Sequence, residues 1–176
     1  RGYAFRGFET GNPIVDQPIS ELRILWSTQY YYRMLELIGG CEDSVDVVLF
    51  HIAMPEENHP SARLVNALAA AHQRGVRVRV LLDRDRDIDP YRSTVINEKA
   101  FGILEASGID VKWDKEISLT HSKFLIFDQS VSVDGSHNWS AGSYFQFDDM
   151  SFELHSETLA AELGARFQTV WDSNSA

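Results

Sequence analysis

The amino-acid sequence predicts an α/β fold in which a mixed β-sheet is flanked by helices on both faces. Segments with strand character alternate with segments whose apolar residues recur at helical spacing. One largely apolar, β-branched run indicates a strand that is buried on both sides. We find no internal repeat, low-complexity stretch or linker-like change in composition, so one compact domain is predicted over residues 21–176. An irregular arm containing Gly and Pro, residues 1–20, precedes it.

The first three predicted elements are a strand, a helix and the central strand. Residues 22–26 alternate well enough for a strand, and apolar side chains then recur every three or four residues over 31–38. Gly39 and Gly40 end this helix. Residues 45–53 form the apolar, β-branched run that is typical of a central strand.

The next elements continue the alternation. Residues 61–74 place apolar side chains on one side of a helix, which Gly75 ends. Residues 76–82 are a second β-branched strand, and a further helix carries apolar residues over 96–104 before Gly108 closes it. Helices therefore separate the early strands.

Strands lie closer together in the last third of the chain. The sequence predicts strands at residues 109–113, 121–127, 131–133 and 150–154. Apolar side chains at a four-residue period over residues 159–171 predict the final helix. The alternation as a whole favours a mixed sheet covered by helices and disfavours an all-β fold.

Composition and charge exclude several classes of protein. Hydrophobic residues make up 44% and charged residues 24% of the 176 residues, which is ordinary for a globular domain. The formal net charge of -10 has the wrong sign for a broad basic surface that binds nucleic acid, so any phosphate site must be local. Cys41 is the only cysteine, which excludes an internal disulfide and a multi-cysteine zinc site.

The sequence leaves the compartment of the protein open. No apolar run approaches the roughly 18 residues that a membrane span requires. The sequence starts at Arg1 rather than Met, which is compatible with the loss of a targeting or anchoring segment from the N-terminus. Localisation is therefore not predicted.

The residue pattern with the most chemical information begins at His121. Because successive side chains of a strand point to opposite faces, His121 and Lys123 are expected on one face, roughly 7 Å apart along the chain. A histidine beside a protonated amine is what attack on an anionic phosphodiester needs, with the amine holding the phosphate. Asp128 has the opposite parity, so we expect it to support nearby backbone.

A second group of polar residues follows the next predicted strand. Gly135 is interpreted as permitting an unusual backbone conformation at the turn. Ser136 and Asn138, again two apart, offer neutral donors for phosphate oxygens, although the same residue types commonly satisfy the backbone of a turn. His137 is expected to point away from this group, and Trp139 to pack beside it.

Together these residues resemble the signature of the phospholipase D superfamily: H-x-K, four residues, D, six residues, then G-S-x-N. Every position matches, and the resemblance spans residues 22–171. It implies an α-β-α sandwich and a two-step transfer that requires no metal or other cofactor. In this reaction His121 attacks phosphorus to form a phosphohistidine, and a second histidine protonates the leaving oxygen and then activates water.

The resemblance also implies a homodimer. Family members carry two such motifs, in one chain or in two paired chains, and this chain has one. The other histidines all lack a lysine two residues later: His51, His59, His72, His137 and His155. The two copies of His121 are therefore expected to meet at one composite site across a two-fold axis.

One position departs from the family pattern. The family usually has N-x-E downstream of the signature, with the carboxylate orienting the nucleophilic histidine. Here residues 147–150 are Phe-Asp-Asp-Met, so Asp149 is the first candidate for this carboxylate and Glu153 the second.

Three functions follow from these expectations. The first is a nuclease acting on DNA or RNA, since single-motif members of the family are mostly nucleases. The second is a phosphodiesterase that acts on a phospholipid headgroup, for which an apolar rim beside the site would be the discriminating feature. The third is a phosphate-binding or oligomerisation module with a weakened site, suggested by the missing glutamate.

Overall fold

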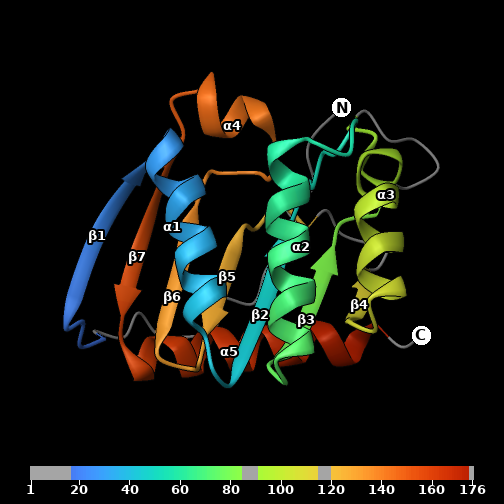
Figure 1. Cartoon of the computed structure of the whole chain (residues 1–176). Helices are drawn as coiled ribbons and strands as arrows, with labels where there is room; N and C mark the ends of the chain where they lie inside the picture. Colours follow the sequence, from blue (N-terminus) through green and yellow to red (C-terminus); the bar gives the residue numbers. More distant parts are fainter. Residues whose placement is uncertain (1–16, 85–90, 115–119, 175–176) are drawn as a thin grey trace, which may run out of the picture.

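The computed structural model describes residues 17–84, 91–114 and 120–174. Most of the arm predicted at the N-terminus therefore lies outside the described residues. The described part contains one seven-stranded sheet in the order β1-β7-β6-β5-β2-β3-β4 (Figure 1). The strands are β1 Glu21–Trp26, β2 Ser44–Leu49, β3 Arg77–Leu82, β4 Asp110–Trp113, β5 Phe124–Phe127, β6 Val131–Gly135 and β7 Met150–His155. The helices are α1 Ser27–Gly40, α2 Pro60–Gln73, α3 Ser93–Ala106, α4 Ala141–Phe145 and α5 Glu157–Ser173.

The sheet is mixed, as predicted. β2, β3 and β4 run parallel, whereas β5, β6, β7 and β1 are each antiparallel to their neighbours. All six residues of β2 are buried, which confirms the central strand that its β-branched run predicted. The strand ends at Leu49, earlier than predicted, and Ile52 instead forms a single bridge with Trp139.

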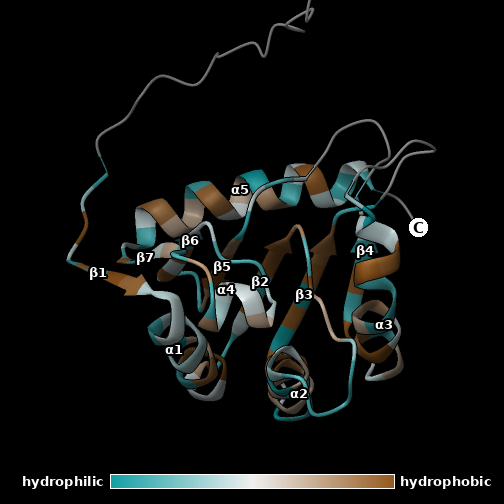
Figure 2. Cartoon of the chain, turned by 90° about the horizontal axis from the view of Figure 1, so that it is seen from above, coloured by the Kyte–Doolittle hydropathy of each residue, from teal (hydrophilic) through white to brown (hydrophobic). Residues whose placement is uncertain are grey.

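Helices cover both faces of the sheet, which confirms the predicted layers. Figure 2 shows α1, α2 and α3 on one face and α5 on the other. The larger core lies between the sheet and the first three helices, and a smaller one lies under α5 around Phe167 and Trp171. None of the helices described here combines the length and hydropathy that crossing a membrane would require.

The strand predicted at residues 121–127 begins only at Phe124, so His121 and Lys123 precede it. The pairing of β5 with β2 ends at Val48 opposite Phe124, although β2 continues to Leu49. The backbone before Phe124 loses its ladder partner on that side. The two functional candidates therefore lie in an irregular segment at the edge of the sheet rather than within a strand.

An apolar strip remains exposed on one end of the sheet. Arg23 binds Glu153, which binds Arg33 of α1, so the odd-numbered side chains of β1 and β7 face α1. The even-numbered ones face the other side, and Leu22, Ile24 and Trp26 are 52%, 46% and 47% exposed there. They pair with partly exposed apolar residues of β7. We call this set the β1–β7 strip: Leu22, Ile24, Trp26, Met150, Phe152 and Leu154.

Candidate active site

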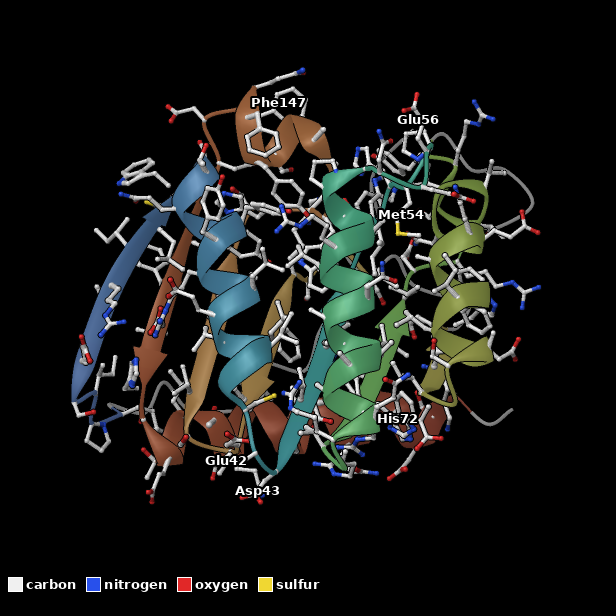
Figure 3. The ribbon with its side chains drawn as sticks, in the orientation of Figure 1. Glu42, Asp43, Met54, Glu56, His72 and Phe147 are labelled. Carbon is white, nitrogen blue, oxygen red and sulfur yellow. The ribbon has the colours of Figure 1, made fainter. Side chains whose placement is uncertain are left out.

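The polar residues singled out in the sequence gather mainly at one edge of the sheet. Because β5 is antiparallel to β2 and to β6, the end of β2, the start of β5 and the end of β6 lie at the same edge. The start of β7 lies there too. In Figure 3 the labels Met54 and Phe147 mark this edge, and Glu42 and Asp43 mark the opposite one.

His121 and Lys123 both lie against the ring of Phe50, which follows β2. The centroid of the His121 ring is 4.8 Å from that of Phe50, and the Lys123 ammonium is 5.3 Å from it. Lys123 Nζ also donates a hydrogen bond to the backbone oxygen of His121 at 2.5 Å. His121 is exposed, whereas Lys123 is only 7% exposed. The structure thus brings the two residues together, as their spacing predicted.

The surroundings favour the neutral form of His121. Burial of part of the ring lowers the pKa of His121, and the positive charge of Lys123 lowers it further. Burial also lowers the pKa of Lys123, while three carboxylates, Asp149, Asp134 and Asp83, oppose this effect. A neutral imidazole keeps a free lone pair at neutral pH, and this is the form that can attack an electrophile.

The titration of His121 can be measured directly. In an NMR titration of the imidazole signals, we expect a midpoint below the ordinary value of 6.5 for the wild-type protein. Lys123→Met should raise the midpoint, because it removes a neighbouring positive charge that opposes protonation. The His59 signals of the same samples provide the control, since His59 is the N-cap residue before α2 and Lys123 does not contribute to its pKa. An unchanged His121 midpoint in the variant would contradict this electrostatic account.

The hydroxyl of Ser136 forms hydrogen bonds to the residues that lead into β7. Its hydroxyl donates to Asp149 Oδ1 at 2.6 Å and accepts from the backbone N–H of Met150 at 3.0 Å. Gly135 does not have the unusual backbone conformation that we predicted, since the described glycines with positive φ are Gly75 and Gly108. It is required for a different reason: a Cβ at Gly135 would lie 2.4 Å from the backbone oxygen of Met150.

The residues around Asn138 anchor this segment to α1. His137 stacks on Tyr30 at 4.1 Å, and Trp139 Nε1 donates to the Tyr30 hydroxyl at 3.1 Å, so both rings point inward as expected. The backbone N–H of Asn138 donates to Ser143 Oγ at 3.2 Å. Its amide oxygen is buried and accepts no hydrogen bond from the described residues. Asn138 is thereby held between two inward-facing aromatic neighbours.

The two carboxylates left open by the sequence have different surroundings. Glu153 is fully buried and accepts hydrogen bonds from Arg33 at 2.7 and 2.8 Å, on the α1 side of the sheet. Burial alone raises the pKa of Glu153, but the hydrogen bonds from Arg33 and His155 and the positive charges of Arg33 and Arg23 together outweigh it, so the pKa is lowered. Asp149 instead lies at the site edge against Ser136. Asp149 is therefore the better placed candidate.

Asp128 lies at the far edge of the sheet, where it supports backbone as its parity predicted. Its carboxylate accepts hydrogen bonds from the backbone N–H groups of Glu42, Asp43 and Ser44 at 3.1, 2.8 and 2.9 Å. Asp128 and Gln129 both have positive φ, 47° and 53°, in the turn from β5 to β6. The motif carboxylate thus ties this turn to the start of the central strand.

Asp128→Ala is expected to lower the free energy of unfolding by about 2 kcal/mol, since three backbone donors lose a charged acceptor. The loss is measured by urea unfolding at neutral pH. Asp128→Asn is the matched control, because asparagine keeps an acceptor oxygen and tolerates positive φ, so its loss should be smaller. Equal stability of Asp128→Ala and wild type would show that these hydrogen bonds contribute nothing net.

Within the described ranges, 17–84, 91–114 and 120–174, no three His, Cys, Asp or Glu side chains come together in a group that could hold a metal ion. The groups that the structure assembles at the edge are an imidazole, an ammonium, a hydroxyl, an amide and a carboxylate.

Comparison with solved structures finds the same fold in two bacterial proteins. A phospholipase D family member, NUC from Salmonella typhimurium, superposes with a TM-score of 0.73 at 20% identity, covering 88% of this chain and 96% of that one. NucT from Helicobacter pylori superposes with a TM-score of 0.69 at 14% identity, covering 89% and 98%.

Sequence comparison finds relatives among curated proteins. The mitochondrial cardiolipin hydrolase of Canis lupus familiaris is 28% identical over 140 residues, covering 80% of this chain and 50% of the relative. The human protein of the same name is 34% identical over 108 residues, covering 61% and 37%. A phospholipase D from Rickettsia conorii is 31% identical over 109 residues, covering 60% and 51%. The chain thus spans about half the length, or less, of these relatives.

A family model described as "Cardiolipin synthase, PLD-like domain" matches residues 34–171, which is most of the chain and includes all six signature positions. The matched range runs from α1 to α5. Together with the shared fold, this match shows that the chain belongs to the phospholipase D-like domain family.

Proposed function

We propose that the chain is a phosphodiester hydrolase that requires no metal ion and uses His121 as its nucleophile. The observation that carries this proposal is the placement of His121 and Lys123 together against Phe50, at the edge that also holds Ser136 and Asp149. The buried ammonium of Lys123 attracts a phosphodiester anion, and the exposed neutral imidazole beside it can reach the phosphorus atom.

In the first step a ring nitrogen of His121 attacks phosphorus. A nitrogen–phosphorus bond forms while the bond from phosphorus to the leaving oxygen breaks, and that oxygen takes a proton from a protonated imidazole on the opposite side. Lys123 stabilises the negative charge that gathers on the phosphoryl oxygens. Asn138 contributes a neutral donor to the same oxygens, and Asp149 orients the imidazole of His121.

In the second step water attacks the phosphohistidine. The now neutral second imidazole takes a proton from water, the nitrogen–phosphorus bond breaks, and the electron pair returns to His121. The second imidazole comes from His121 of another copy of the chain, because this chain has one such motif. The active species is accordingly a homodimer with a composite site.

Covalent trapping tests this mechanism. Wild-type protein is mixed with a phosphodiester in EDTA, quenched with base, which preserves phosphohistidine, and digested for mass spectrometry. A phosphorylated peptide that contains His121 is expected in the wild type and absent from His121→Ala. If turnover occurs in EDTA without any such peptide, His121 is not the nucleophile. If neither turnover nor peptide occurs with any phosphodiester, a binding module with a weakened site is the better description.

We propose nucleic acid, DNA or RNA, as the first substrate class. The ring of Tyr91, which is 52% exposed, lies 5.8 Å from that of Phe50, so an exposed aromatic side chain stands beside the catalytic pair. Such rings stack on the bases of single strands. Tyr91→Ala should raise KM for a single-stranded oligonucleotide in EDTA more than for a small chromogenic diester, and Tyr91→Phe should not. Equal effects of Tyr91→Ala on both substrates would exclude base stacking.

One observation favours phospholipid as a second substrate class. The β1–β7 strip ends at Trp26 and Met150, and Met150 follows Asp149 of the site. This exposed apolar surface is of the kind expected at the rim of a lipid site, and it suits contact with acyl chains. Two groups of relatives are named for lipid hydrolysis, as cardiolipin hydrolase and phospholipase D. Trp26→Ser should then reduce hydrolysis of phospholipid vesicles while leaving cleavage of oligonucleotides unchanged, and the reverse pattern would exclude the lipid class.

A further inference from the structure

We propose that Asp83, which the family signature does not contain, is a positioning residue for His121 and Lys123. This proposal rests on the function proposed above. Asp83 directly follows β3 and is 1% exposed. Its backbone N–H donates to the backbone oxygen of Leu49 at 3.3 Å, which places it at the site edge, next to the end of β2.

The first support for this role is a contact with the residue before the nucleophile. Asp83 Oδ1 accepts a hydrogen bond from the backbone N–H of Thr120 at 2.7 Å. The hydroxyl of Thr120 donates in turn to Asp114, whose other oxygen accepts from Asn174 at 2.9 Å. Two carboxylates, those of Asp83 and Asp114, thus hold Thr120, the residue before His121. This segment precedes β5 and belongs to no strand, so the two contacts help to fix its position.

The second support is a buried amide that joins Asp83 to the ring beneath the catalytic pair. Asn97 of α3 is fully buried, and its Nδ2 donates to the backbone oxygens of Asp83 at 3.0 Å and Phe50 at 2.8 Å. Its Oδ1 accepts from the backbone N–H of Ile52 at 2.7 Å. Asp83 therefore holds a fixed position relative to Phe50, against which His121 and Lys123 lie.

The third support is charge. Lys123 is almost fully buried, and a buried ammonium is costly unless carboxylates lie near it. The carboxylates whose charges act on Lys123 come from three separate segments: Asp149 before β7, Asp134 in β6 and Asp83 after β3. Asp83 alone among these also binds the backbone next to His121. Its carboxylate thereby links the position of the nucleophile to the charge of the phosphate-binding lysine.

Two substitutions of Asp83 distinguish the effect of its hydrogen bond to Thr120 from the effect of its negative charge on Lys123. Asp83→Asn keeps an oxygen for the Thr120 N–H but removes the negative charge. We expect kcat to fall by about ten-fold with KM little changed, as for partners that act through a catalytic group. The alkaline limb of the pH profile should also move to lower pH, because Lys123 would lose its proton more readily. Asp83→Ala should lower kcat further, since it frees Thr120 as well.

Asp114→Asn is the matched control. It weakens the same loop through the Thr120 hydroxyl, but Asp114 does not contribute to the pKa of Lys123. It is expected to lower kcat without moving the alkaline limb. If Asp83→Asn leaves both kcat and the pH profile at wild-type values, or only reproduces the behaviour of Asp114→Asn, the proposal is overturned.

Amide hydrogen exchange at Thr120 distinguishes failure of this proposal from failure of the proposed function, because it requires no activity. Exchange should be faster in Asp83→Ala and near the wild-type rate in Asp83→Asn, with thermal melting confirming that both variants are folded. Wild-type protein without hydrolytic activity would refute the proposed function, yet the exchange rates would still decide whether Asp83 holds this segment. Unchanged exchange in a folded Asp83→Ala would refute the positioning role.

Discussion

Replacement of His121 with alanine is expected to reduce hydrolysis of a chromogenic phosphodiester by about a thousand-fold or more, as removal of a catalytic nucleophile does. The assay is run in EDTA at neutral pH, where the lowered pKa of His121 favours the neutral imidazole that attacks phosphorus. The loss should appear in kcat, because Lys123 still binds the phosphate group. A loss confined to kcat would indicate that separate side chains of this short segment carry substrate binding and chemistry.

Ser122→Ala provides the control for this loss. Ser122 lies between the two catalytic candidates and is exposed, so its hydroxyl can be removed without disturbing a packed interior. Activity close to that of the wild type is expected. Comparable activity of His121→Ala and wild type would end the case for nucleophilic catalysis at this position, because the alanine side chain cannot attack phosphorus.

The second large effect is expected in a mixed dimer, in which one chain carries His121 and the other carries alanine at this position. Wild-type chains and His121→Ala chains carrying different affinity tags are co-expressed, and the mixed dimer is isolated by purification on both tags. Its kcat should be about a hundred-fold or more below that of the wild-type dimer, because the turnover lacks either the nucleophile or the general acid. Two independent sites would instead retain about half of the activity.

A dimer of wild-type chains and Ser122→Ala chains, purified in the same way, shows whether tagging or co-expression affects the rate. It is expected to be as active as the wild type. The composite site is refuted by a mixed His121→Ala dimer that retains half of the activity, and equally by wild-type protein that is active as a monomer in sedimentation measurements at the assay concentration.

Much of the fold could be predicted from local pattern. The β-branched run identified β2 as buried on both faces, and helical spacing identified α1, α2, α3 and α5. The short helix α4 was not predicted, because its five residues are too few to show a period. Its ends are instead set by contacts such as the hydrogen bond from Thr28 Oγ1 to the backbone oxygen of Tyr144.

Part of the site could be predicted in the same way. The spacing of two residues predicted that His121 and Lys123 lie together. The odd–even offset of Asp128 predicted that it lies away from them, and it binds the backbone at the start of β2. The sequence indicated that Gly135 is needed, but the reason given, an unusual backbone conformation, was wrong. Glycine is needed there because the backbone of β7, which is distant in sequence, lies too close to leave room for a Cβ. A close approach of this kind leaves no local pattern.

The sequence by itself determined the succession of strands and helices along the chain except for α4, the family and the groups available for chemistry, because these depend on residue type and on spacing along the chain. Only the tertiary structure decided that Glu153 belongs to an ion pair with Arg33, that Asp149 stands at the site, and that Asp83 holds the residue before His121. It also decided that the β1–β7 strip is exposed. These features depend on which distant segments the sheet brings together, and on which of its faces a helix covers.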